Sequence, residues 1–390
     1  MSVAGIDPGT KSFDITLLEG DIVRREASLD TKLVAREPQR LIEVLDGMSA
    51  DYIVAPSGYG VPVTFGSEIR DARRFAVEVL LLSSEEIIAE GVKMGEVGVW
   101  VYSALADIVE HLVKNYGGRV LFLPAVVNLR SVPRHRKINK VDMGTVDKLA
   151  STFLAVHETS EKENVDYEKV DVIVAELGYG YVASIAVKQG KIVDGVGGTY
   201  ASTGTLTSGA LDAELVAGAG SWKRWDIFHG GLLEALGAVD MGSIVKGYER
   251  GEEPYKSYLE AYIEGIAKDV RRALTSTPKA GILIVTGRHG KNETIVKRLK
   301  ELLPELDVRN LEGLKGASKS KEAAQGYAAI GEGIVGTRFG KLVDHMGIKD
   351  ACGTTVDYIV HPRAKGFIER VKRAYIETVS NPKLCGDGQA

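Results

Sequence analysis

The chain opens with a short turn whose side chains could bind a nucleotide phosphate. Residues 7 to 12 read DPGTKS, so a carboxylate heads a glycine turn that also carries two hydroxyls and an ammonium. Glycine puts no Cβ in the way of an incoming oxyanion and lets backbone N–H groups converge on it. We therefore predict that the turn contacts the nucleotide through these residues: Asp7, Gly9, Thr10, Lys11 and Ser12.

A second turn of the same kind lies about 170 residues further along the chain. Residues 176 to 181 read ELGYGY, so a carboxylate again heads a glycine turn. Two such turns in separate halves would suit a triphosphate held from both sides, with its magnesium ion near Asp7 and Glu176. We expect ATP and Mg²⁺ to bind here. The predicted contacts in this turn are Glu176, Gly178, Tyr179 and Gly180.

A third segment completes the predicted nucleotide site. An apolar strand leads into Thr286, Gly287 and Arg288, and a helix follows. Gly287 would let a flat purine and its ribose lie against the backbone, although an ordinary strand-to-helix turn explains the same residues. The chain has no GxxxxGK[S/T] and no GxGxxG at the start of a helix, which excludes Walker-type and dinucleotide-binding motifs.

Candidate catalytic residues lie between the first two turns, in residues 133–149. Asp142 comes just before a predicted helix and could act as a base for an alcohol acceptor, whereas a carboxylate acceptor needs no base. Arg134 and Arg136 belong to a basic cluster that could hold an anionic substrate or a moving phosphoryl group. Helix capping would explain Asp142, and a solvated loop would explain the arginines equally well, so these alternatives stay open.

Two three-strand meanders are predicted to position the phosphate turns. Residues 3–6 and 13–18 read as strands around the first turn, and residues 172–175 and 182–187 read as strands around the second. In each copy a further turn follows, with the sequence GDIV in the first and GKIV in the second. These matches predict a chain built from two related halves, with chance similarity of two hairpins as the alternative.

The two turns and the strand that ends in Thr286 and Gly287 resemble the superfamily of acetate kinase, sugar kinases, heat-shock ATPases and actin. Within it the sequence is most similar to butyrate kinase, and also to an uncharacterised archaeal family usually labelled a predicted butyrate kinase. The resemblance implies an α/β fold of duplicated ribonuclease H-like (actin-like ATPase) domains. Each domain would have a mixed five-stranded sheet flanked by helices, and the two lobes would enclose a cleft. The implied N-terminal lobe is residues 1–143 plus 366–390, and the C-terminal lobe is residues 144–365.

The activity that the resemblance implies is ATP-dependent phosphorylation of a small carboxylic acid in the cleft. Two departures from the butyrate kinase pattern bear on this. The substrate-loop arginine is absent where this chain has PSGYG at residues 56–60, and Tyr179 stands at the middle glycine of the second phosphate loop. Two alternatives are therefore a nucleotide-dependent switch or ATPase without acid kinase activity, and a kinase for an alcohol acceptor that uses Asp142 as its base.

Composition agrees with a small-molecule substrate. A length of 390 residues suits two domains, and a net charge of −4 without single-sign blocks argues against nucleic acid or an anionic membrane as a partner. No apolar run of eighteen residues occurs, so we expect neither a membrane span nor secretion. The two cysteines, Cys352 and Cys385, are too few for a disulfide framework. We expect a cytoplasmic protein, with a homodimer as one possible assembly.

Overall fold

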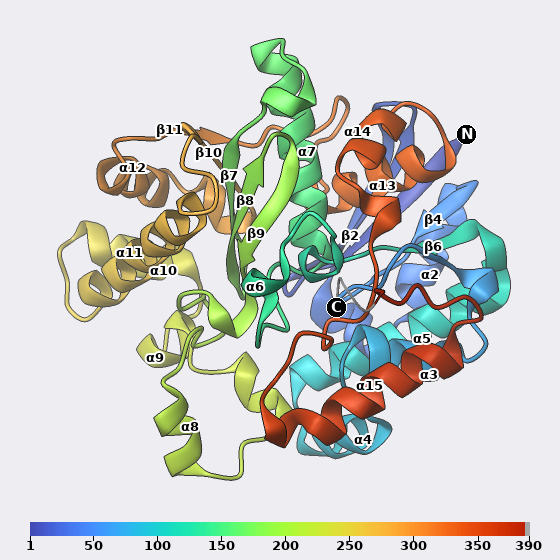
Figure 1. Ribbon diagram of the computed structural model, residues 1–390. Helices are drawn as coiled ribbons and strands as arrows, with labels where there is room; N and C mark the ends of the chain where they lie inside the picture. The colour runs from blue at the N-terminus through green and yellow to red at the C-terminus, as the bar shows by residue number, and fades with distance from the viewer. Residues whose placement is uncertain (387–390) are drawn as a thin grey trace.

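The first sheet has six strands in the order β3-β2-β1-β4-β6-β5, in a computed structural model that describes residues 1–386 (Figure 1). Its strands are β1 (Ser2–Pro8), β2 (Ser12–Glu19), β3 (Ile22–Asp30), β4 (Tyr52–Val54), β5 (Thr64–Phe65) and β6 (Val120–Phe122). β1 to β3 form the predicted antiparallel meander, while β4 runs parallel to β1. The short β5 runs antiparallel to β6 at the edge, so this sheet has one strand more than the five predicted.

The second sheet repeats this local plan with five strands in the order β11-β10-β7-β8-β9. Its strands are β7 (Val172–Leu177), β8 (Val182–Lys188), β9 (Lys191–Val196), β10 (Ile282–Thr286) and β11 (Asp307–Asn310). β7 to β9 form an antiparallel meander, and β10 runs parallel to β7 as β4 does to β1. The predicted α/β fold of two related halves with mixed sheets is therefore confirmed.

Two helices lie between the two sheets. α7 (Val146–Glu163) packs against β7 and β8, α13 (Glu322–Val335) packs against β1 and β2, and the two helices pack against each other (Figure 1). A Cβ on Gly326 would lie 2.2 Å from the carbonyl oxygen of Ala150, so this close approach of the helices requires glycine. α13 therefore packs on the first sheet, although it follows the second sheet in the chain.

The remaining helices flank the sheets. Those before α7 are α1 (Thr31–Arg36), α2 (Gln39–Met48), α3 (Ala72–Arg74), α4 (Glu85–Met94), α5 (Val97–Tyr116) and α6 (Arg134–Lys137). Those after α7 are α8 (Ala213–Ala219), α9 (Leu232–Leu236), α10 (Met241–Glu249), α11 (Tyr255–Leu274), α12 (Glu293–Leu302), α14 (Gly340–His345) and α15 (Lys365–Thr378). None of the helices within residues 1–386 combines the length and apolar composition needed to cross a membrane.

The outer helices complete the burial of both sheets. Successive side chains of a strand point to opposite faces, so Ile173 and Val174 belong to different cores. α11 packs against β7 and β8 on the face opposite α7, and α15 packs against residues 75–80 of the first half. The division into lobes of residues 1–143 plus 366–390 and residues 144–365 stays a prediction, and residues 387–390 lie outside the described structure.

Residues 202–231, which we call the bridging segment, leave the second half and reach the first. The segment contains α8 and a 3₁₀ turn, η7 (Arg224–Phe228). Trp225 is 8% exposed and belongs to the same core as α5 of the first half. Lys223 Nζ lies 2.8 Å from a carboxylate oxygen of Glu90 beside it. Burial of the indole ring therefore anchors the segment on the first half.

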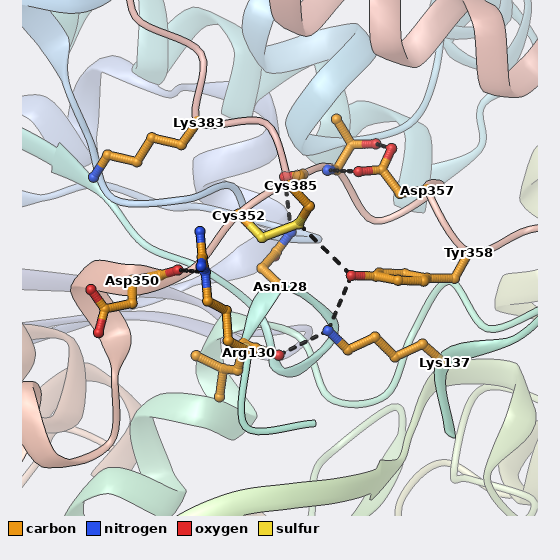
Figure 2. Close-up of a disulfide and its surroundings, with 12 residues drawn as sticks. Asn128, Arg130, Lys137, Asp350, Cys352, Asp357, Tyr358, Lys383 and Cys385 are labelled. Atoms are coloured by element: carbon orange, nitrogen blue, oxygen red, sulfur yellow. Dashed lines mark hydrogen bonds between the residues drawn. A yellow bond between two sulfur atoms is a disulfide. The ribbon is translucent and has the colours of Figure 1, made fainter. Parts of the chain in front are cut away.

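A disulfide ties the C-terminal segment to the body of the protein (Figure 2). It joins Cys352 to Cys385, which the sequence analysis does not predict. The Cys352 amide donates to the carbonyl of Asn128 at 3.1 Å, and the Gly353 amide donates to the carbonyl of Lys383 at 2.7 Å. The bond and these contacts hold the segment after α15 against the loop that contains Asn128.

Candidate functional site

A single large cavity receives the three predicted nucleotide segments. Its volume is about 1270 Å³, and residues of both halves line it. Typical ligand pockets measure roughly 300–1,000 Å³, so this cavity has room for a nucleotide together with a second small substrate. The predicted residues that line it are Asp7, Gly9, Thr10, Lys11, Asp142, Glu176, Gly178, Tyr179, Gly180, Thr286, Gly287 and Arg288.

The first phosphate turn is built around a buried ion pair. Asp7 lies near the end of β1 and is 2% exposed. Its Oδ2 lies 2.5 Å from Nζ of Lys321, the residue just before α13. The same ammonium lies 3.2 Å from Asp14 on β2. Burial raises the pKa of Asp7, and Lys321 only partly offsets this. A Cβ on Gly9 would lie 2.0 Å from this ammonium, so glycine leaves the space that the lysine occupies.

The second phosphate turn has the same pairing of a carboxylate with a lysine. Glu176 lies near the end of β7, and its Oε2 is 3.0 Å from Nζ of Lys148 on α7. Lys148 also contacts Asp147. Burial raises the pKa of Glu176 to about 7, with Lys148 acting in the opposite direction and Asp147 adding to the rise. Each turn therefore presents a carboxylate and an ammonium to the cavity.

The second turn accommodates its tyrosine without strain. Tyr179 does not have a positive φ, so the turn does not require glycine at this position. The Tyr179 ring lies 5.8 Å from the ring of His289 and 5.9 Å from the ammonium of Lys11. The departure from the glycine pattern thus places an aromatic face between two nucleotide segments.

The segment predicted to contact the purine and ribose, which we call the adenosine segment (residues 286–288), approaches the second turn closely. Gly287 follows β10 with φ of 85°, and a Cβ there would lie 2.6 Å from the carbonyl oxygen of Leu177. The position therefore needs glycine for both its φ and its space. Arg288 donates from Nη2 to the hydroxyl of Ser12 at 3.1 Å, so this segment reaches the first turn as well. Ser12 does not line the cavity, but through this hydrogen bond it contacts Arg288, which does.

The three predicted catalytic residues separate in the structure. Asp142 lines the cavity, and burial raises its pKa to about 6 although the Gly144 amide donates to it at 2.8 Å. Arg134 and Arg136 lie on α6 and are not among the residues that line the cavity. Arg136 instead donates to the carbonyl of Val193 on β9 at 2.8 Å. The structure therefore does not bring the two arginines to the predicted site.

The carboxylates of the site fit a magnesium ion that arrives with a nucleotide. Within residues 1–386 no three His, Cys, Asp or Glu side chains are grouped so as to hold a metal ion by themselves. Mg²⁺ in nucleotide complexes is usually held by one or two carboxylates, by waters and by the phosphates. Asp7 and Glu176 match that kind of donor set rather than a protein cage.

Several residues of the site escape prediction from the sequence. Lys148 and Lys321 stand beside the two carboxylates, and Glu322 accepts a hydrogen bond from Thr286 at 3.3 Å. Arg224 and Tyr59 also line the cavity. The two lysines hold similar positions, since Lys148 lies in the first turn of α7 and Lys321 comes directly before α13.

Comparisons with known proteins agree with this picture. A family model described as "Protein of unknown function (DUF1464)" matches residues 5–361. A "Probable butyrate kinase" from Bacteroides thetaiotaomicron is 30% identical over 154 residues, which cover 36% of this chain and 43% of that protein. The chain thus matches less than half of the length of this relative. The match confirms the resemblance to butyrate kinase over the aligned segment.

Solved kinases share the fold. A propionate kinase from Francisella tularensis subsp. tularensis SCHU S4 has a TM-score of 0.56 at 14% identity, covering 83% of this chain and 98% of that one. The acetate kinase of Porphyromonas gingivalis has a TM-score of 0.52 at 15% identity, covering 88% of this chain and 99% of that one. These likenesses confirm the two-lobed fold that the sequence predicts.

Proposed function

The chain belongs to the family described as "Protein of unknown function (DUF1464)", and from its site we propose that it is an ATP-dependent phosphotransferase acting on a small carboxylic acid. The observation that carries the proposal is the pair of glycine turns in one cavity, each headed by a carboxylate with a lysine partner, buried at Asp7 and partly buried at Glu176. The turns lie close together, because a Cβ on Gly180 would be 3.1 Å from the hydroxyl of Thr10. An arrangement of this kind suits phosphates held from both sides.

The proposed roles follow from the charges of the site. Lys148 and Lys321 stabilise the negative charge of the phosphates, which is the main demand of phosphoryl transfer. Asp7 and Glu176 face the cavity where they would hold Mg²⁺ that enters with the nucleotide. The ion would neutralise phosphate charge, and it would draw the two carboxylates into their ionised form.

A carboxylic acid acceptor needs no base from the protein. An oxygen of its carboxylate forms the new bond to the γ-phosphorus, and the bond from that phosphorus to the bridging oxygen breaks. ADP leaves with the electron pair, and no proton moves. The part of the protein is then positioning and charge stabilisation.

An alcohol acceptor is the second candidate, and Asp142 favours it. A buried carboxyl whose pKa is raised to about 6 can take a proton from a hydroxyl near neutral pH. Asp142→Asn separates the two candidates, because an acid kinase should tolerate the loss of this base and an alcohol kinase should lose at least about 100-fold in kcat.

The proposal is tested by incubating the protein with MgATP and short-chain acids and trapping any acyl phosphate with hydroxylamine. We expect a hydroxamate from at least one acid and a rise in melting temperature with MgADP. No hydroxamate with any acid, together with clear MgADP binding, would exclude the acid kinase and leave a nucleotide switch or an alcohol kinase. If MgADP and MgATP leave the melting temperature unchanged at millimolar concentration, the nucleotide site itself is refuted.

A further inference from the structure

The bridging segment contributes an arginine to the lining of the cavity. Arg224 opens the turn η7, and its guanidinium reaches the first half of the protein. Its Nη2 donates to the hydroxyl of Tyr59 at 2.9 Å and to that of Tyr102 at 3.4 Å. A third, longer contact runs from Nη2 to the carbonyl of Leu81 at 3.5 Å.

The positive charge of Arg224 has no counterion. Within residues 1–386 no carboxylate lies within 4.0 Å of its nitrogens, and its partners are neutral oxygens and the ring of Tyr59, whose centre lies 5.5 Å from Cζ. Nε is buried without a hydrogen-bond partner, and Nη1 makes no hydrogen bond to the described residues. Burial raises the pKa of Tyr102 and Tyr181 well above their usual range, so these phenols do not supply negative charge near neutral pH.

An arginine without a counterion lowers the stability of the folded protein unless a ligand supplies the opposite charge. Charges withdrawn from water are normally paired with an opposite charge. Arg224 is partly buried, and its hydrogen bonds go only to neutral oxygens. The surrounding surface leaves one side open, because Arg224, Tyr59 and Tyr102 all line the cavity. The missing partner can therefore enter from the cavity.

We propose that Arg224, with the hydroxyls of Tyr59 and Tyr102, binds the carboxylate of the acceptor acid. The inference rests on the proposed phosphotransferase function and adds the residues that select the acceptor. A guanidinium suits a carboxylate because its planar N–H donors match the two oxygens. Arg224 is then a binding residue that the second half contributes to a pocket of the first half.

The pocket beside Arg224 also defines the class of acid. Its wall is apolar, with Val101, Leu105 and Phe228 among the lining residues, and Phe228 packs edge-on against Tyr102 with ring centres 5.6 Å apart. An acid with an aliphatic or aromatic side chain would bury apolar surface against this wall.

The test measures binding of butyrate, isovalerate and phenylacetate by calorimetry in the presence of saturating MgADP. Butyramide and phenylacetamide serve as uncharged controls of the same shape. We expect the protein to bind at least one acid and to bind the matching amide at least about 10-fold more weakly, since a hydrogen bond to a charged group contributes about 1.5–3 kcal/mol. Arg224→Gln should weaken acid binding by a similar factor while the affinity for MgADP changes less than about 2-fold. Arg250→Gln, which alters an exposed arginine outside the cavity, should change neither affinity.

The outcomes separate this inference from the proposed function. If the wild-type protein does not bind MgADP, the proposed function is contradicted. Normal MgADP binding with no acid bound, or with acid binding that Arg224→Gln leaves intact, overturns the role of Arg224. If Arg224→Gln does not fold, the double variant Tyr59→Phe/Tyr102→Phe replaces it in the test. This variant keeps the Arg224 guanidinium but lacks the two hydroxyls, and it should weaken acid binding several-fold. Unchanged acid binding by that double variant also overturns the proposal.

Discussion

At the scale of single residues, lysines set the charge state of the carboxylates in the site. Lys148 stands between Asp147 and Glu176, and one ammonium cannot neutralise two buried carboxylates. Burial opposes charge on Asp147 too, but contacts with Lys148 and Thr145 keep its pKa low. Glu176 is left with the raised pKa, so its proton should respond to pH and to any cation that enters the cavity.

Stability should therefore depend on pH through Glu176. Its pKa is raised from 4.5 to about 7 on folding, so between these values the folded protein holds a proton that the unfolded chain has released. The folded state binds more protons in this window, and the free energy of unfolding falls as pH rises through it. At about 1.4 kcal/mol per pH unit, the loss due to this group amounts to about 3 kcal/mol.

Urea unfolding of the ligand-free protein at pH 5 and pH 8 measures this effect against Glu176→Gln. The variant lacks the titrating group, so the difference in unfolding free energy between wild type and variant should fall by about 2–3 kcal/mol from pH 5 to pH 8. Glu43→Gln, on the half-exposed surface of α2, is the matched control and should show no such change. A difference that is independent of pH would show that Glu176 is ionised throughout.

Residues of the site could be predicted where their position depends on local sequence. Asp7, Glu176 and Thr286 each lie at or next to the end of a strand before a turn, and that pattern is visible within a few residues. Arg224 could not be found in this way, because the bridging segment must first dock on the other half to bring it to the cavity. Arg136 shows another limit of local sequence, since its basic neighbours suggest an anion site but in the structure it donates to Val193 on β9.

At the scale of elements, small residues let α7 and α13 fill the space between the two sheets. Gly5 on β1 and Gly326 on α13 lie at contacts where a Cβ would meet backbone atoms at 2.4 Å and 2.2 Å. The Ala and Gly content of residues 321–336 permits close packing or close ligand approach, and in the structure the segment forms the closely packed helix α13. What local composition does not reveal is that this helix packs on the first sheet rather than on the second.

The same substitution should have opposite effects at a packed and an exposed glycine. Gly326→Ala forces α13 away from Ala150 and should lower the free energy of unfolding by about 1–3 kcal/mol. Gly366→Ala lies on exposed α15 with no atom near the added Cβ, and it should raise stability by about 0.5–1 kcal/mol. Thermal and urea unfolding check both values. A stabilised Gly326→Ala protein would contradict the close packing of α7 and α13.

At the scale of the whole molecule, two of the contacts between the halves differ in strength. α7 and α13 form an extended buried contact between the sheets, and their residues belong to one continuous core. The bridging segment is held on the first half by Trp225 and Phe228, by the hydrogen bonds of Arg224 and by a few exposed ion pairs. Exposed ion pairs contribute little, so the aromatic residues dominate this second contact. We infer that the halves separate more readily at the bridging segment than at α7 and α13.

Two tryptophans of the bridging segment allow this inference to be tested. Trp225→Ala removes a buried ring from the core of the first half, whereas Trp222→Ala alters a ring that is 36% exposed. Loss of the anchor should speed proteolysis within residues 211–221 by at least about 10-fold, since about 1.4 kcal/mol of docking energy corresponds to that factor and a buried tryptophan contributes more. It should also weaken acid binding through Arg224, while MgADP binding remains. Equal proteolysis rates for the two variants would show that the bridging segment is held by something other than Trp225, and the coupling between docking and acceptor binding would then fail.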